Sequence, residues 1–250
     1  MHTLRIATYN IHKGFPFGNK RLAVHDLRER LRTLDTDLVF LQEVHGANSQ
    51  HAARFENWPA APQYEFLADE KWPDFAYGRN AVYDEGHHGN AILSRYPILA
   101  WENEDISSHG YESRGMLHCE MHPPRWSETL HCVCVHLGLW GRHRGVQIEK
   151  LRRRIERLVP PTAPLIVAGD FNDWRFRVTQ QLAHPLNLHE VFELTRGGRP
   201  ARSFPAVLPL MSLDRIYVRG LRVEDTHVHH GRTWSRISDH AVLTATLTLL

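Results

Sequence analysis

Two stretches, Leu38-Val39-Phe40-Leu41-Gln42-Glu43 and Leu165-Ile166-Val167-Ala168-Gly169-Asp170-Phe171-Asn172, are apolar runs that lead into an acid. Short apolar runs bounded by turn residues are typical of strands that are buried on both faces. Because an unpaired carboxylate is costly inside such a core, we expect Glu43 and Asp170 at the rim where each strand ends. In layered α/β proteins, ligands bind at that rim. The two runs predict a layered α/β fold with acidic groups facing a cleft.

The composition is that of a globular protein. Of 250 residues, 42% are hydrophobic and 23% are charged, which excludes a disordered chain and allows one large core. No linker or low-complexity tract divides the sequence, so we expect a single domain over residues 1–250. No apolar stretch is long enough to cross a bilayer, and the strand pattern begins too early for a signal peptide. We therefore expect a cytoplasmic protein without a transmembrane segment or an obligate protein partner.

Charge and cysteine usage give no strong signal of their own. The net charge of +2 does not indicate binding to a polyanion. The 19 histidines lack the paired spacing of a zinc motif. Cys119, Cys132 and Cys134 fit small buried hydrophobic residues better than a disulfide or a metal site.

Periodicity predicts strands and helices that alternate, with several strands close together in the middle. Helical spacing of apolar residues predicts helices over about 20–34 and 142–158. Apolar and alternating runs predict strands over residues 3–10, 38–43, 75–83, 89–94, 98–103, 115–121, 129–137, 165–170, 213–218, 221–229 and 240–249. This order favours two sheets packed face to face with helices outside.

Polar residues at strand ends are the candidates for chemistry. On a strand, Asp170 and Asn172 would point the same way and could hold one water, although Asp and Asn are also common in turns and caps. Asp214 starts an apolar strand and needs a partner, for which His240 in Ser238-Asp239-His240 is the best candidate. Asn10 and His136 also follow apolar runs, where a hydrogen-bonded rim residue is the more common case.

Taken together, these motifs resemble the endonuclease/exonuclease/phosphatase superfamily, which includes DNase I-like nucleases, inositol polyphosphate phosphatases and bacterial sphingomyelinases. They occur in the family's order and span nearly the whole chain: Tyr9-Asn10, Leu41-Gln42-Glu43, Gly89-Asn90-Ala91-Ile92-Leu93-Ser94-Arg95, Val135-His136-Leu137, Gly169-Asp170-Phe171-Asn172, Leu213-Asp214-Arg215-Ile216 and Ser238-Asp239-His240.

The resemblance implies a four-layer α/β sandwich of the DNase I-like type, with two mixed, mainly antiparallel sheets. It also implies hydrolysis of a phosphoester with Mg²⁺, or Mn²⁺, as cofactor. By the matching motifs, Glu43 would bind the metal with Asn10 and Asp239 close to it. Asp170 would activate water and Asn172 would orient it. His240, held by Asp214, would stabilise the phosphoryl transition state, and His136 would contact the phosphate.

The substrate stays open at this stage. Asn90 and Arg114 are candidates for substrate binding, although Arg114 could equally pair with an acid. A nucleic acid, a nucleotide and a lipid head group are all compatible with the sequence. The near-neutral charge speaks against a nuclease, and the missing export signal against a sphingomyelinase-like enzyme. A non-catalytic module that binds phosphorylated ligands on the same fold is the alternative from a different class.

Overall fold

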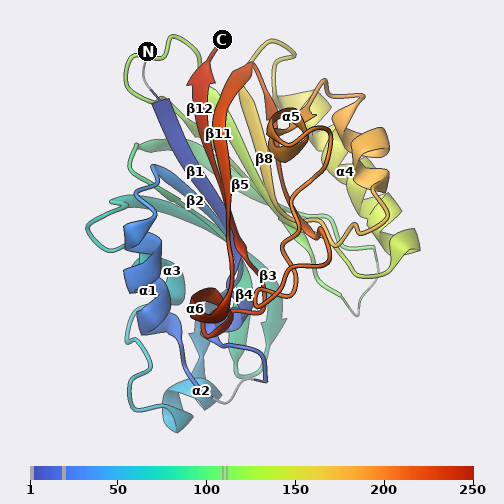
Figure 1. Ribbon diagram of the computed structural model, residues 1–250. Coiled ribbons are helices and arrows are strands. Elements are labelled where there is room, and N and C mark those ends of the chain that lie inside the picture. The colour runs from blue at the N-terminus through green and yellow to red at the C-terminus, as the bar shows by residue number, and fades with distance from the viewer. Residues whose placement is uncertain (1–2, 19–20, 109, 111) are drawn as a thin grey trace.

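The computed structural model, which describes residues 3–18, 21–108, 110 and 112–250, contains two six-stranded sheets (Figure 1). The strand order of the first sheet is β11-β12-β1-β2-β4-β3. Its strands are β1 (Thr3–Asn10), β2 (Leu38–Asn48), β3 (Asp74–Tyr83), β4 (Gly86–Ser94), β11 (Leu221–His229) and β12 (Val242–Leu249). The strand order of the second sheet is β5-β6-β7-β8-β10-β9. Its strands are β5 (Ile98–Asp105), β6 (Gly115–Met121), β7 (Leu130–His136), β8 (Leu165–Asp170), β9 (His189–Glu190) and β10 (Asp214–Arg219).

Each sheet is built around one parallel pair of strands. β1 pairs parallel with β2, and β7 pairs parallel with β8, while the other pairings are antiparallel. A parallel pair needs a crossover connection, which α1 (Val24–Thr33) supplies in the first sheet and α4 (Gly141–Leu158) in the second. The two halves of the chain thus repeat one strand-helix-strand unit, whose second strand carries Glu43 or Asp170.

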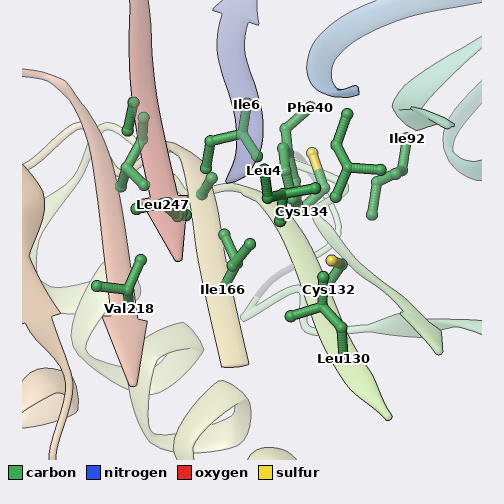
Figure 2. Packing of buried hydrophobic residues seen from close by; sticks show 14 of the residues in the cluster. Leu4, Ile6, Phe40, Ile92, Leu130, Cys132, Cys134, Ile166, Val218 and Leu247 are labelled. Atoms are coloured by element: carbon green, nitrogen blue, oxygen red, sulfur yellow. The ribbon is translucent and has the colours of Figure 1, made fainter. Parts of the chain in front are cut away.

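The main core lies between the two sheets. Figure 2 shows apolar side chains from both sheets in this layer, among them Ile6 and Phe40 from the first and Ile166 and Val218 from the second. Cys119, Cys132 and Cys134 are buried there with free thiols, as the sequence predicts.

Helices cover the outer faces of both sheets. Figure 1 shows α1 and α3 (Gln63–Ala68) on one side of the sheets and α4 on the other. The predicted apolar stripe of α1 is buried through Val24, Leu27 and Leu31, and that of α4 through Ile148, Leu151 and Ile155. These helix and sheet layers confirm the expected DNase I-like four-layer sandwich.

Most predicted elements are present, with shifted ends. Lys20, the expected start of the first helix, lies outside the described residues, and the helix begins at Val24. The last strand begins at Val242 instead of His240. The elements missed are short: α2 (Ser49–Arg54), α3, a π-helix (Thr179–Ala183), α5 (Val191–Thr195), α6 (Arg232–Ser235), the 3₁₀ turn His12–Gly14 and β9. Elements of one or two turns show no periodicity. Among the described residues, no helix combines the length and apolar character needed to span a bilayer.

Candidate active site

Glu43 lies at a bulge inside β2. The pairing of β2 with β4 shifts register between Leu41 and Val44, and Glu43 has a positive φ of 55°. A bulge inserts residues out of register and re-aims a side chain, and a left-handed backbone at a non-glycine residue is a cost often found at functional sites. The bulge directs Glu43 into a cavity while the strand continues to Asn48. The expectation that this strand ends at Glu43 was wrong, because the bulge exposes the carboxylate without ending the strand.

Asp170 ends β8 and is flanked in register by two other predicted site residues. It lies opposite His136 on β7 and opposite Asp214 on β10, so one row across three strands carries all three. Gly169 permits this pairing, since a Cβ there would lie 1.9 Å from the Val135 carbonyl oxygen. Asn172 follows in a turn with a φ of 49°. It does not extend the strand, yet it still lines the same cavity.

The Oδ2 atom of Asp170 is the point where the site residues converge. Asn10 Nδ2 donates to it over 3.1 Å, His136 Nε2 lies 3.5 Å away and His240 Nε2 lies 3.8 Å away. The other oxygen, Oδ1, accepts the backbone N–H of Asn172 over 2.9 Å. Burial and then the neighbouring Asp214 raise the pKa of Asp170 to about 6. A carboxylate of that pKa can accept a proton near neutral pH.

Asp214 holds His240 in place. His240 Nδ1 donates to Asp214 Oδ2 over 2.8 Å, and Asp214 is fully buried. Burial alone would lower the pKa of His240, but Asp214 and then Asp170 raise it to about 10. Ser238 accepts the His240 backbone N–H and donates its hydroxyl to the Asn10 carbonyl oxygen. His240 is therefore a fixed imidazolium whose Nε2–H is directed toward Asp170.

Glu43 has a different electrostatic environment. Burial would raise its pKa, but the influence of His136 and of the Lys13 ammonium, 3.5 Å from Glu43 Oε2, lowers it to about 2. Asn10 Nδ2 lies 3.4 Å from Glu43 Oε1. The Oδ1 of Asp239 lies 3.9 Å from His12 Nδ1. Burial and then Arg114 hold the pKa of His136 well below its usual value, whereas Glu43 raises it.

The donor chemistry around Glu43 fits a hard divalent cation. Glu43 and Asp239 carry carboxylate oxygens, which Mg²⁺ and Mn²⁺ prefer over nitrogen or sulfur. Asn10 directs its Nδ2 toward Glu43, and its Oδ1 accepts the His12 backbone N–H. Among the described residues, ligand atoms within 4.8 Å of one another occur in two other groups, Asp170, Asp214 and His240, and His118, Glu120 and His131. In the first of these groups, His240 Nδ1 donates to Asp214 Oδ2 and its Nε2 faces Asp170.

One cavity of about 380 Å³ joins the two sheet rims. It is lined by Asn10, Glu43, Arg114, His136, Leu139, Asp170, Asn172, Trp174, Phe204, Met211, Leu213 and His240. Three of the predicted residues stand outside this lining. Asp214 lies behind His240, and Asp239 lies beside His12. Asn90 is buried between the sheets, where its amide donates to the carbonyl oxygens of Gly115 and Cys134.

Arg114 reaches the cavity with its guanidinium anchored on Glu112 over 2.8 Å. The sequence left phosphate contact and acid pairing as alternatives for this residue. The ion pair with Glu112 is present, and the side chain lines the cavity at the same time.

Sequence reasoning missed several neighbours of the site. His12 and Lys13 follow Asn10 in a turn where both have positive φ, which brings the Lys13 ammonium to Glu43. Phe204 packs against the His240 ring at 5.1 Å between centroids. A signal for the first pair was available, since Asn10-Ile11-His12-Lys13-Gly14 follows a strand and places a glycine where the chain must turn.

Comparisons with known proteins show to which family the chain belongs. A sequence profile of the Endonuclease/Exonuclease/phosphatase family matches residues 7–240. The uncharacterized protein YbhP of Escherichia coli (strain K12) is 49% identical over 248 residues, covering 99% of this chain and 97% of YbhP. The human Nocturnin catalytic domain superposes with a TM-score of 0.74 at 16% identity, covering 99% of this chain and 94% of that one. A mannosyl-6-phosphatase of Bacteroides thetaiotaomicron gives 0.71 at 16% identity, covering 98% and 100%. At such low identity the solved structures show only a shared fold. The profile match, however, extends over nearly the whole chain, and therefore the protein belongs to the endonuclease/exonuclease/phosphatase family.

Proposed function

We propose that this protein hydrolyses a phosphomonoester or phosphodiester with the help of a divalent cation. The observation that carries the proposal is the convergence of Asn10, His136 and His240 on one oxygen of Asp170, beside the carboxylate of Glu43. The family acts on phosphoester substrates, and a relative of the same fold is named a mannosyl-6-phosphatase. The convergent groups supply a base, a cation site and a positive charge, which phosphoester hydrolysis requires.

Asp170 is the proposed general base. Its Oδ2 faces the cavity, and its raised pKa makes the carboxylate a better proton acceptor than an ordinary aspartate. Asn10 and the Asn172 backbone N–H fix the orientation of this carboxylate. The Asn172 side chain is anchored in turn, because its amide nitrogen donates to the Leu137 carbonyl oxygen over 2.8 Å. Asn172 is thereby positioned to orient the attacking water.

His240 is the proposed electrostatic stabiliser. Negative charge builds up on the phosphoryl oxygens in the transition state, and a fixed imidazolium can donate its Nε2–H to one of them. The carboxylate of Asp214 stabilises the charged ring through its 2.8 Å hydrogen bond to Nδ1. Because this bond already exists before the reaction, His240 need not reorient in the transition state. His136 and Arg114 line the same cavity and would contact the phosphate from the side of the second sheet.

Glu43, Asp239 and Asn10 are the proposed ligands of Mg²⁺ or Mn²⁺. When bound, the cation would neutralise phosphoryl charge and lower the pKa of a water. Glu43 remains ionised across the neutral range, since its pKa is about 2. Asn90, which bridges β6 and β7 from β4, would act as a positioning residue for the cavity floor instead of a direct substrate ligand.

A magnesium-dependent rate on bis-p-nitrophenyl phosphate and p-nitrophenyl phosphate tests the proposal. We expect turnover that EDTA abolishes and that His240→Ala reduces by about 10²–10³-fold. The alternative, a non-catalytic module for phosphorylated ligands, predicts binding of phosphate esters without turnover of either substrate. Absence of turnover across these esters, abasic DNA, RNA, inositol phosphates and phospholipids with both metals would refute the enzyme.

A further inference from the structure

Three loops around the site cavity expose hydrophobic side chains. The rim loops, as we call residues 139–142, 174–177 and 204–211, meet at the cavity, since Leu139, Trp174, Phe204 and Met211 all line it. More than half of the strongly exposed large hydrophobic residues in the described parts of the chain belong to these loops: Leu139, Trp140, Trp174, Phe176, Val207, Leu208, Leu210 and Met211. Grouped apolar exposure of this kind marks an interaction surface.

The third rim loop is apolar and its backbone is tied down. Phe204-Pro205-Ala206-Val207-Leu208-Pro209-Leu210-Met211 contains no charged or polar side chain. Phe204 and Met211 form an isolated bridge, Leu210 donates its N–H to the Phe204 carbonyl oxygen, and Ala206 donates to the carbonyl oxygen of Asp239. In Figure 1 this loop belongs to the orange part of the chain that follows α5. Leu208 and Leu210 nevertheless remain 65% and 61% exposed. These backbone bonds tie the loop to itself and to Asp239, so its exposed side chains project from a fixed backbone.

Cationic side chains stand among the aromatic ones in the other two rim loops. Arg142, Arg175 and Arg177 are exposed, and none of them has an ion pair with a carboxylate of the described residues. A second cavity of about 520 Å³ lies between Trp140, Trp174, Arg175 and Arg177, and it shares Leu139 and Trp174 with the site cavity.

No exposed acid lies in the rim loops to offset these arginines. Asp173, which precedes the second loop, is buried and faces Arg144 at 3.7 Å. Arg144 in turn lies 5.2 Å from the centre of the Trp174 ring, which holds this tryptophan in place. The surface around the site is thus apolar and positively charged.

We propose that the rim loops dock onto a bilayer surface that contains anionic phospholipids, and that the phosphoester hydrolysed is the head-group phosphate of a phospholipid. This step rests on the proposed phosphoesterase function. Val207, Leu208 and Leu210 would enter the acyl boundary, where aliphatic side chains gain most, and Trp140 would lie at head-group level, where tryptophan is favoured. The arginines would bind lipid phosphates, which attract basic residues close to the surface.

Two other occupants fit the rim less well. A nucleic acid would use the tryptophans and arginines, but the aliphatic hairpin offers no ring for base stacking, and the net charge of the chain is only +2. A second copy of the chain could cover the apolar residues, but a two-fold interface would set the same arginines of both copies against each other. A membrane with anionic lipid satisfies both the apolar and the charged parts.

Vesicle sedimentation with the Asp170→Asn variant separates docking from turnover. We expect this variant to bind phosphatidylglycerol/phosphatidylcholine vesicles better than pure phosphatidylcholine vesicles, and to bind them less as salt is raised. Adding Leu208→Ser with Leu210→Ser should lower the partition coefficient by about tenfold or more. The matched control is Leu99→Ser with Leu194→Ser, two leucines that are 61% and 57% exposed outside the rim, and it should bind like its parent.

The charge arm of the test uses Arg175→Glu with Arg177→Glu. This pair should abolish the preference for phosphatidylglycerol, whereas Arg153→Glu with Arg157→Glu on the exposed side of α4 should keep it. In the otherwise wild-type protein, Leu208→Ser with Leu210→Ser should keep the rate on bis-p-nitrophenyl phosphate and lose the rate on vesicle phosphatidylglycerol.

The outcomes separate the two proposals. Vesicle binding without turnover of any ester would refute the phosphoesterase and leave the docking surface intact. Absence of vesicle binding would overturn the docking proposal, as would equal loss in the Leu99/Leu194 control. A rim variant that instead loses single-stranded DNA binding, or that converts a dimer to a monomer, would also overturn it.

Discussion

Glu43 and Asp170 are carboxylates of the two facing sheets, and one amide, Asn10 Nδ2, contacts both at 3.4 and 3.1 Å. Their pKa values nevertheless differ, at about 2 for Glu43 and about 6 for Asp170. Glu43 has the Lys13 ammonium beside it, whereas Asp170 is more deeply buried and lies next to Asp214. Carboxylates that are pushed apart in this way can divide the work of a metal ligand and a base.

The largest effect expected from this division is on turnover. Asp170→Asn removes the proton acceptor and should lower kcat by about 10²–10⁴-fold, because general base catalysis contributes that much. Steady-state rates on a soluble phosphodiester at saturating Mg²⁺ measure the effect. Asp37→Asn is the matched control, since Asp37 is also a buried carboxylate next to a strand end but pairs with Arg95 away from the site. A near-normal kcat for Asp170→Asn would remove Asp170 from the role of base.

Glu43→Gln should act on metal dependence instead. Removing a residue that hydrogen-bonds a metal ligand lowers metal affinity by about 10–100-fold. Removing the ligand itself should therefore raise the Mg²⁺ concentration for half-maximal rate by at least about that factor. Asp170→Asn should leave this concentration unchanged when the residual rate is titrated. If the two variants shift the Mg²⁺ requirement equally, the carboxylates share the metal and the division of roles is wrong.

Asp214→Asn tests the positive charge on His240. Burial lowers the pKa of His240 and Asp214 overcomes it, so the variant should lower that pKa from about 10. Activity that needs the imidazolium is retained below its pKa, and the alkaline limb of the kcat/KM profile should move to lower pH by more than about one unit. Asp225→Asn is the control, because Asp225 pairs at 2.7 Å with the exposed His227. An unmoved alkaline limb would show that His240 does not act as a cation.

The second-sheet side of the site is the part that the sequence predicts best. The apolar run of β8 ends at Asp170 as expected, since a carboxylate cannot continue a strand that is buried on both faces. The same cost predicts a partner for Asp214, and His240 is found 2.8 Å from it. Both inferences need only the rule that a buried charge must be compensated.

The Glu43 side depends on backbone geometry that residue types do not reveal. The bulge at Glu43 and the left-handed turn at His12 and Lys13 are set by tertiary packing, because non-glycine residues rarely adopt these conformations alone. The loop at 204–211 is similar, since its residues are all apolar and only the fold leaves several of them exposed. Local pattern rules fail where the surrounding fold fixes the conformation.

The smallest expected effect, on stability in EDTA, tests the comparison most directly. The pKa of Asp170 is raised from 3.8 to about 6, so the folded state binds more protons between these values and stability is lost as the pH rises through that window. For Glu43 the pKa falls from 4.5 to about 2, so its stabilisation is fully present above 4.5 and is lost as the pH falls toward 2.

At pH 8, Asp170→Asn should therefore raise Tm and Glu43→Gln should lower it. Each change is on the order of 1–3 kcal/mol, or roughly 2–4 °C per kcal/mol for a chain of this size. Differential scanning calorimetry measures both shifts. Shifts of the same sign would mean that one common electrostatic environment governs both carboxylates, and the separate roles of ligand and base would then have no physical origin.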